Sequence, residues 1–258
     1  MWVCVIAHDL YFVYHKKNGR RFCIGAERTT MQAELRTRDA LGPLSPTEEK
    51  NAPDVLYTSG DISLLTQGSR VSIVGSRKAS EEGLRRTRIV TKALVDHGII
   101  VVSGLADGID TVAHRTAIEE GGRTIAVLGT PLSKAYPAKN AKLLDAIKRD
   151  HLAVSQFPEG CPARSQNFPQ RNRTMALLSD ATIVIEASET SGTRHQGWEA
   201  IRLGRHVYLL ENVATNPALT WPKELMAYGA QVLKRNDLPD ILLDIPNFTA
   251  GGMRAFEL

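Results

Sequence analysis

Five short apolar runs recur along the chain from residue 71 onward, each bounded by polar or glycine-containing segments. They are rich in β-branched residues and cover residues 71–74, 99–102, 124–128, 182–185 and 206–210. Near-continuous apolar runs of this length are typical of strands that helices cover on both faces. The pattern therefore predicts buried strands of a mainly parallel sheet.

The segments between these runs have the length and polarity of amphipathic helices. After the first run, Ser80 is a favourable N-cap, and carboxylates at positions 81 and 82 oppose the helix dipole. Leu84, Thr87, Val90 and Leu94 then form one mostly apolar stripe, and a glycine at position 98 ends the helix. Strand, helix and strand at about 25-residue spacing is the βαβ pattern. We expect an α/β protein with a Rossmann-like, doubly wound and mostly parallel sheet.

The first part of the chain lacks this regular alternation. Residues 2–7 and 11–14 are predicted to pair as strands around positions 8 and 9, and residues 30–41 to form a helix. Glycine and two prolines within residues 41–46 predict a linker. We expect an N-terminal extension at residues 1–50, a Rossmann-like domain at residues 51–240 and a C-terminal tail at residues 241–258. The early aromatic residues are interpreted as a strand pair packed on the core, with a partner interface as the alternative: Trp2, Tyr11, Phe12 and Tyr14.

Composition and charge narrow the class of protein only slightly. A chain of 258 residues with 43% hydrophobic residues can bury one large α/β core. The net charge is +4, but residues 70–92 alone contain seven Lys or Arg against two Glu, which favours an anionic partner. Cys4, Cys23 and Cys161 form no metal-binding or disulfide pattern, so reduced thiols in a cytoplasm are expected. No apolar run approaches the roughly 20 residues that cross a bilayer, so no membrane partner is expected.

In a doubly wound sheet, functional groups gather in the loops that follow the strands. The first such loop offers Gly75, Ser76, Arg77, Lys78 and Ser80, which together suit a phosphate at a helix N-terminus. It is neither a GxGxxG nor a Walker A sequence, and the next strand ends without the acid that a bound NAD ribose requires. The alternative is a tight turn with solvated cations.

The second loop contains Ser103, Gly104 and Gly108, whose small residues let backbone N–H groups face an anion. Asp110 and His114 lie one helical turn apart, so they could pair with each other or bind a metal ion together. A helix-capping Asp with a hydrogen-bonded His explains them better, because no third ligand accompanies them.

Two further loops carry candidate binding residues. Phe168, Arg171, Asn172 and Arg173 combine a stacking face with cations and an amide, as single-strand binders do, although a salt-bridged helix start is the alternative. Two arginines that are two positions apart point in different directions, so one is expected to face phosphate and the other to pair internally. The fourth loop resembles another anion site and presents three residues at a helix start: Ser191, Gly192 and Thr193.

None of the loops contains a nucleophile with a base and an orienting group, and GxSxG and HExxH sequences are absent. We therefore expect no catalytic residue, no metal and no cofactor.

Taken in order, these loops resemble those of the DprA/Smf family of bacterial DNA-processing proteins. The similar segments are GSRKAS at residues 75–80, SGLADGID at 103–110, GGRTIAVLG at 121–129, YP at 136–137 and FPQRNR at 168–173. The resemblance extends over roughly residues 51–210, and five elements in the correct order make it specific. It implies a non-catalytic protein that binds single-stranded DNA, forms a homodimer and assists RecA recombinase loading. It also implies that the residues facing phosphate are Ser76, Arg77, Lys78, Gly104, Arg171 and Arg173.

Two other hypotheses remain open from the sequence. The same broad superfamily contains nucleoside-monophosphate phosphoribohydrolases, which carry a PGGxGTxxE loop. The partial similarity here is Ser191-Gly192-Thr193 with Glu199, which lies six residues beyond Thr193 instead of three and is therefore rotated away. The chain would then be a nucleotide-binding enzyme or sensor. The last hypothesis is a partner protein that binds neither DNA nor nucleotide.

Overall fold

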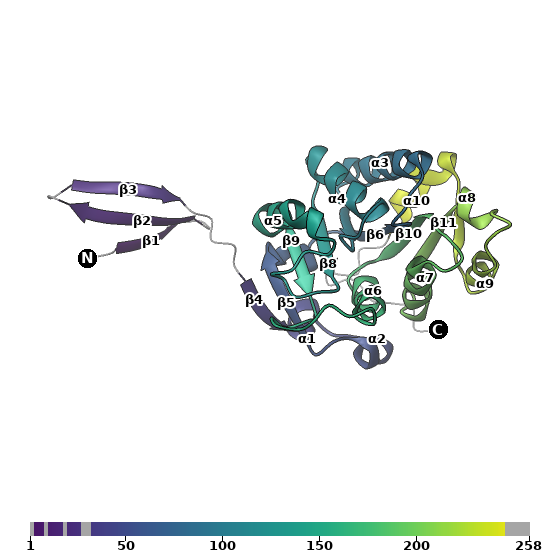
Figure 1. Cartoon of the computed structure of the whole chain (residues 1–258), viewed down its shortest axis with the longest axis horizontal. Helices are drawn as coiled ribbons and strands as arrows, with labels where there is room; N and C mark the ends of the chain where they lie inside the picture. Colours follow the sequence, from purple (N-terminus) through teal and green to yellow (C-terminus); the bar gives the residue numbers. More distant parts are fainter. Residues whose placement is uncertain (1–2, 8–9, 18–19, 27–31, 246–258) are drawn as a thin grey trace. The chain divides into compact units, whose positions relative to one another are not determined.

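The computed structural model describes residues 3–7, 10–17, 20–26 and 32–245 (Figure 1). Contacts divide the chain into two compact units, Met1–Met31 and Gln32–Leu258. In the smaller unit, β1 (Val3–Ala7), β2 (Leu10–Lys17) and β3 (Arg20–Ala26) form an antiparallel sheet in that order. The predicted pairing of the first two strands is confirmed, because Val3 lies opposite Tyr14 and Ala7 opposite Leu10. That this pair packs on the core stays a prediction.

The larger unit contains one nine-stranded sheet in the order β12-β11-β10-β6-β7-β8-β9-β5-β4. All adjoining strands from β12 to β9 run parallel, and only the β9–β5 and β5–β4 pairs are antiparallel. The expected mostly parallel α/β sheet is confirmed. Its strands are β4 (Gln32–Arg36), β5 (Val55–Gly60), β6 (Arg70–Gly75), β7 (Ile100–Ser103), β8 (Thr124–Leu128), β9 (Leu152–Ser155), β10 (Ala181–Glu186), β11 (His206–Leu210) and β12 (Gln231–Leu233).

The order of the strands places a topological switch beside β6. From β6 the chain proceeds outward through β7, β8 and β9, and it then returns to β10, which pairs with β6 on its other side. Loops that leave the carboxyl ends of β6 and β10 must therefore diverge to opposite sides of the sheet. In open α/β sheets this divergence produces the crevice where ligands bind.

Helices cover both faces of the sheet because the strand side chains alternate (Figure 1). Val71 and Ile73 of β6 pack with α3, α4 and α10, whereas Val74 packs on the face that α6, α7 and α9 cover. The helices are α1 (Thr37–Leu41), α2 (Pro46–Asn51), α3 (Glu81–Asp96), α4 (Ile109–Glu119), α5 (Ala141–Asp150), α6 (Asn167–Leu177), α7 (Gly192–Arg202), α8 (Glu211–Ala214), α9 (Trp221–Ala227) and α10 (Leu238–Asp244); short 3-10 turns are η1 (Ile62–Leu65), η2 (Ala138–Asn140) and η3 (Arg235–Asp237).

The predicted limits of α3 agree with the structure. Ser80 caps the helix, since its hydroxyl accepts a hydrogen bond from the backbone N–H of Gly83. Thr87, Val90 and Leu94 of the predicted stripe are buried.

The prediction of a helix at residues 30–41 is wrong over its first part. Gln32–Arg36 is a strand whose residues alternate between exposed and half-buried and pair antiparallel with β5, and only Thr37–Leu41 is helical. The linker expected at residues 41–46 overlaps the start of α2. Ser45 and Glu48 form a reciprocal capping box for this helix. Residues 32–50, assigned to the extension from sequence, therefore lie with the large sheet. Of the expected tail, residues 241–245 lie in or directly after α10, and residues 246–258 are outside the described part.

Candidate nucleic-acid interface

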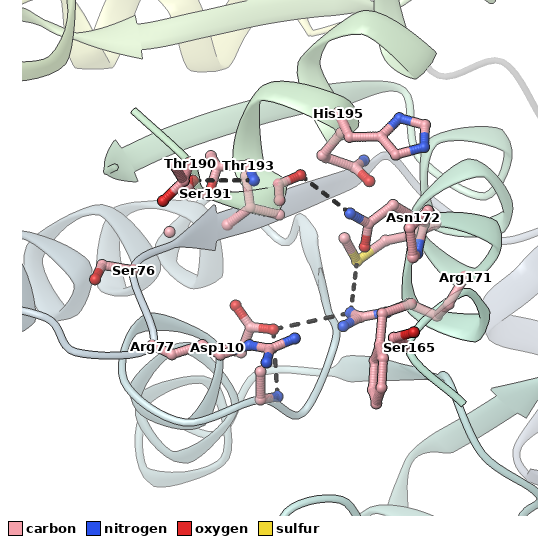
Figure 2. Close-up of a pocket in the computed structure, with 18 of the residues that line it drawn as sticks. Ser76, Arg77, Asp110, Ser165, Arg171, Asn172, Thr190, Ser191, Thr193 and His195 are labelled. Carbon is pink, nitrogen blue, oxygen red and sulfur yellow. Dashed lines mark hydrogen bonds and ion pairs between the residues drawn. The ribbon is translucent and has the colours of Figure 1, made fainter. Parts of the chain in front are cut away.

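A cavity of about 850 Å³ opens at the carboxyl ends of β6 and β10, where the strand order switches (Figure 2). Its walls come from the segments that follow five parallel strands, β6 to β10, and from α6. Ten of the fifteen candidate residues line this one cavity: Gly75, Ser76, Arg77, Lys78, Phe168, Arg171, Asn172, Ser191, Gly192 and Thr193. Tertiary structure thus brings all four loops to one cavity, since Ala106 and Asp110 of the second loop also line it.

The loop after β6 holds two exposed cations at the mouth of the cavity. The backbone N–H of Ser76 donates to the carbonyl of Glu186 (2.9 Å), and the N–H of Lys78 donates to the Ser76 hydroxyl (3.2 Å). These bonds fix the backbone, whereas the side chains of Arg77 and Lys78 form no ion pair within the described residues. Both charges are available to an anionic ligand.

The N-terminus of α3 is already occupied by a carboxylate of the protein. Glu186, at the end of β10, accepts hydrogen bonds from the backbone N–H (3.0 Å) and the hydroxyl of Ser80. Ser80 therefore connects the start of α3 to the end of β10, and it does not line the cavity. Of the candidates in this loop, Gly75, Ser76, Arg77 and Lys78 line the cavity, whereas the backbone N–H and hydroxyl of Ser80 are bonded to Glu186.

An aromatic surface lies beside these cations. The Arg77 guanidinium carbon is 5.3 Å from the centre of the Phe168 ring, which places the charge over the ring face. Tyr136 contacts the same ring with centroids 5.0 Å apart, and its side chain is 46% exposed. Gly129 permits this arrangement, since a Cβ there would lie 2.8 Å from Phe168. The combination of a cation with one exposed ring, Tyr136, and one half-buried ring, Phe168, suits stacked bases and their phosphates.

Arg171 forms the floor of the cavity. It is buried, and its Nη1 lies 3.8 Å from a carboxylate oxygen of Asp110, which is also buried (Figure 2). Burial raises the pKa of Asp110, and the nearby Arg171 charge offsets part of that rise. Gly104 lies directly against the guanidinium, because a Cβ on Gly104 would be 1.2 Å from Nη1 of Arg171. Gly104 thus has a packing role beneath the cavity.

Arg173 points away from the cavity and does not line it. Its guanidinium contacts the buried carboxylate of Glu199 at 3.3 Å, together with Arg202 at 3.0 Å and His195 at 3.4 Å. The expectation that the two arginines point differently is confirmed, but each of them pairs with an internal carboxylate. Glu199 lies outside the cavity lining, which agrees with the rotation predicted for it.

The start of α7 closes the opposite wall. The Ser191 hydroxyl accepts a hydrogen bond from the backbone N–H of Thr193 (3.1 Å), and the Asn172 side chain donates to the carbonyl of Gly192 (3.2 Å). This second bond links α6 to α7 across the cavity. The Asn172 side chain therefore holds the start of α7 in position, and it also lines the cavity.

The two remaining candidates, Ser103 and Gly108, hold the loops in position without lining the cavity. The Ser103 hydroxyl donates to the carbonyl of Ile73 (2.7 Å), so it ties β7 to β6. Gly108 has φ +72°, and a Cβ there would lie 2.3 Å from the carbonyl oxygen of Ser76, so only glycine fits. These two residues shape the cavity without lining it.

Sequence reasoning did not place Asp110 or Tyr136 among the site residues. The sequence predicts Asp110 as a helix cap, whereas its contact with Arg171 joins two helices, α4 and α6, at positions 61 residues apart in the chain. The Tyr136-Pro137 pair belongs to the sequence resemblance, yet only the fold places the tyrosine ring against Phe168. Other residues at the lining, such as Arg164 and Ser165, lie in the loop after β9, which has no sequence pattern of its own.

Among the described residues, no group of three His, Cys, Asp or Glu side chains is arranged to hold a metal ion. The His114 ring bonds Thr124 (2.7 Å), and Asp110 accepts from the backbone N–H of Ala106 (3.3 Å), so neither uses the other as a partner. In residues 32–245, no helix is long and apolar enough to cross a membrane.

The fold and the cavity define a Rossmann-like α/β protein with a cationic, aromatic-edged crevice at its switch point. The family model described as DNA recombination-mediator protein A matches residues 37–245. The chain belongs to this family, known as DprA/Smf.

Curated relatives and solved structures agree with that assignment. The chain is 32% identical to DNA processing protein DprA of Bacillus subtilis over 75% of its length and 65% of the relative's. It is 39% identical to DprA of Streptococcus pneumoniae over 65% and 59% of the two lengths. The chain thus spans less than two thirds of these relatives.

Two solved structures share the fold. The X-ray structure of Streptococcus pneumoniae DprA has a TM-score of 0.73 at 32% identity and covers 83% of this chain and 75% of its own. A Helicobacter pylori DprA structure, described in terms of its single-stranded DNA binding mode, has a TM-score of 0.71 at 25% identity, covering 84% and 98%.

Proposed function

We propose that this protein binds single-stranded DNA in the cavity at the switch point and acts in DNA processing during recombination. The observation that carries the proposal is Arg77, an unpaired loop cation held over the Phe168 ring at the cavity mouth. The family and the Helicobacter pylori relative's described DNA binding support it.

The chemistry of the cavity favours a single strand over a duplex. A duplex hides its bases, whereas an unpaired base can stack on Phe168 or Tyr136 while its phosphate meets Arg77 and Lys78. Arg171 adds a positive charge at the floor that Asp110 holds in place. The protein would then act by binding alone, as a homodimer in the cytoplasm that assists RecA loading, in keeping with the family resemblance.

The test is fluorescence anisotropy with labelled single-stranded and duplex oligonucleotides over a salt series. We expect Arg77→Ala to weaken single-strand binding about tenfold or more, since a hydrogen bond to a charged group contributes about 1.5–3 kcal/mol. Losing one phosphate contact should also reduce the slope of log affinity against log salt by about 0.7.

Arg149→Ala is the matched control, because it also removes one positive charge. Arg149 lies on α5, pairs with Asp150 at 2.7 Å and does not line the cavity. Affinity close to wild type is expected for this variant. Absence of single-strand binding by the wild-type protein at low salt would overturn the proposal, and equal losses in both variants would exclude the cavity as the site.

A further inference from the structure

A single residue, Glu186, holds both ends of the loop that carries Arg77 and Lys78. Its backbone carbonyl accepts a hydrogen bond from the N–H of Ser76 (2.9 Å) at the start of the loop. Its carboxylate accepts hydrogen bonds from the N–H (3.0 Å) and the hydroxyl of Ser80 at the end of the loop. The loop is thus bonded at both ends to one residue of the neighbouring strand, β10.

An irregularity in the sheet places Glu186 at this point. Val184 of β10 lies opposite Val74 of β6, and the register then shifts, so that Glu186 instead of the residue before it lies opposite Gly75. Two glycines leave room for it. A Cβ on Gly75 would lie 3.0 Å from the Glu186 carbonyl oxygen, and a Cβ on Gly83 would overlap the carboxylate. The strand register and the neighbouring glycines therefore both accommodate Glu186.

The carboxylate of Glu186 leaves the cations of the loop unpaired. Within the described residues it forms no ion pair with Lys, Arg or His. It instead binds the N-terminus of α3, where the helix dipole stabilises a negative charge. Between the two bonded ends of the loop, the Arg77 guanidinium lies 5.3 Å from the centre of the Phe168 ring.

We propose that Glu186 is a positioning residue for DNA binding, which holds the loop in the conformation that presents Arg77 and Lys78 to the phosphates of a single strand. A loop that is ordered before binding loses less conformational entropy when DNA binds, so its cations contribute more to affinity. Glu186 itself does not contact DNA and acts through the loop. The inference rests on the function proposed above, because it requires that this loop binds phosphate.

The test measures the full-length variants Glu186→Ala and Glu186→Gln by anisotropy with a single-stranded oligonucleotide. Removing a negative charge near the phosphates should by itself strengthen binding, whereas releasing the loop should weaken it. The two effects therefore have opposite signs in Glu186→Ala. Glu186→Gln is the matched control, because its amide oxygen can still accept the hydrogen bond from the Ser80 N–H while the charge is lost.

We expect Glu186→Ala to bind the oligonucleotide about fivefold more weakly or worse, because two cationic side chains lose their ordered positions. Glu186→Gln should bind at least as tightly as wild type. In a background that lacks both cations (R77A and K78A), Glu186→Ala should cause no further loss of the binding that remains at low salt. A residue with a purely structural role would weaken binding in both backgrounds.

Hydrogen exchange of the backbone amides, measured without DNA, tests the loop directly. We expect faster exchange across residues 76–80 in Glu186→Ala than in wild type or Glu186→Gln, and unchanged exchange in β8 of all three proteins. Unchanged loop exchange in Glu186→Ala would overturn the inference.

Three binding results would also overturn the inference while the proposed function remains. They are wild-type or tighter binding by Glu186→Ala, an equal loss in Glu186→Gln, and a loss that persists without the two cations. Absence of single-strand binding by the wild-type protein would instead overturn the proposed function and this inference together.

Discussion

The floor of the cavity depends on one close contact between a glycine and an arginine. Arg171 is buried at 4% exposure, and its charge is opposed by Asp110 at 3.8 Å. Only the missing side chain at Gly104 leaves room for the guanidinium. Burial lowers the pKa of Arg171 and raises that of Asp110, and the charge of each group opposes the effect of burial on the other.

Gly104→Ala should therefore destabilise the protein even though its backbone conformation suits alanine. The new Cβ would displace the guanidinium and leave Asp110 as an unpaired buried carboxylate, which costs about 3 kcal/mol or more. Chemical denaturation gives the free energy of unfolding. Gly192→Ala is the control, because a Cβ there meets only Asn172 at 3.8 Å. Equal stability of the two variants would show that Arg171 is not held as described.

At the scale of the elements, α4 is joined to β8 by a buried histidine. The Nδ1 of His114 lies 2.7 Å from the Thr124 hydroxyl, and that hydroxyl already donates to the carbonyl of Val101 (2.8 Å). Nδ1 must therefore carry the proton of the neutral ring. Burial, with a contribution from His151, lowers the pKa of His114 to about 3.

The lowered pKa of His114 predicts that the folded protein loses stability at acidic pH. The unfolded chain binds a proton on His114 near the ordinary pKa of 6.5, whereas the folded protein binds it only near 3. The unfolded state therefore holds more protons between these values, so stability is complete above pH 6.5 and is lost as the pH falls toward 3. Between pH 7 and pH 4, wild type should lose about 3 kcal/mol more than His114→Asn, measured by denaturation at each pH. Parallel losses in the two proteins would contradict a neutral buried His114.

At the scale of the whole molecule, the crevice brings cations, hydroxyls and an aromatic ring to one cavity. Asp110 is the one carboxylate at the lining within the described residues, and it faces Arg171. Glu199, the carboxylate that a phosphoribohydrolase would require, is held by Arg173 and Arg202 behind the wall. Among the described residues, a nucleotide bound there would meet one lining carboxylate, Asp110, which already faces Arg171.

We accordingly expect no release of free base when the protein is incubated with each of the nucleoside monophosphates. Chromatography of the products tests this directly, with a boiled sample as the control for spontaneous hydrolysis. Base release that disappears in Glu199→Gln would establish the hydrolase alternative and refute the non-catalytic assignment.

The sequence by itself determined the sheet and the loops. Periodic apolar runs such as those in β6 and β10 report local burial, and glycines, caps and cations mark the loops that follow them. The same local signals failed at Gln32–Arg36, because a strand at the edge of a sheet has few apolar positions and its partner, β5, lies about 20 residues away.

Only the tertiary structure decided which candidate residues line the cavity and which form internal contacts. Arg171 and Arg173 are the same residue type and lie two positions apart. Arg171 nevertheless forms the cavity floor, whereas Arg173 pairs with Glu199 outside the cavity. Phe168 lies in α6, and it meets Tyr136 and Arg77 from two separate loops because the strand order reverses beside β6. A side chain's role depends on which distant segment faces it, and that is fixed by packing over the whole sheet.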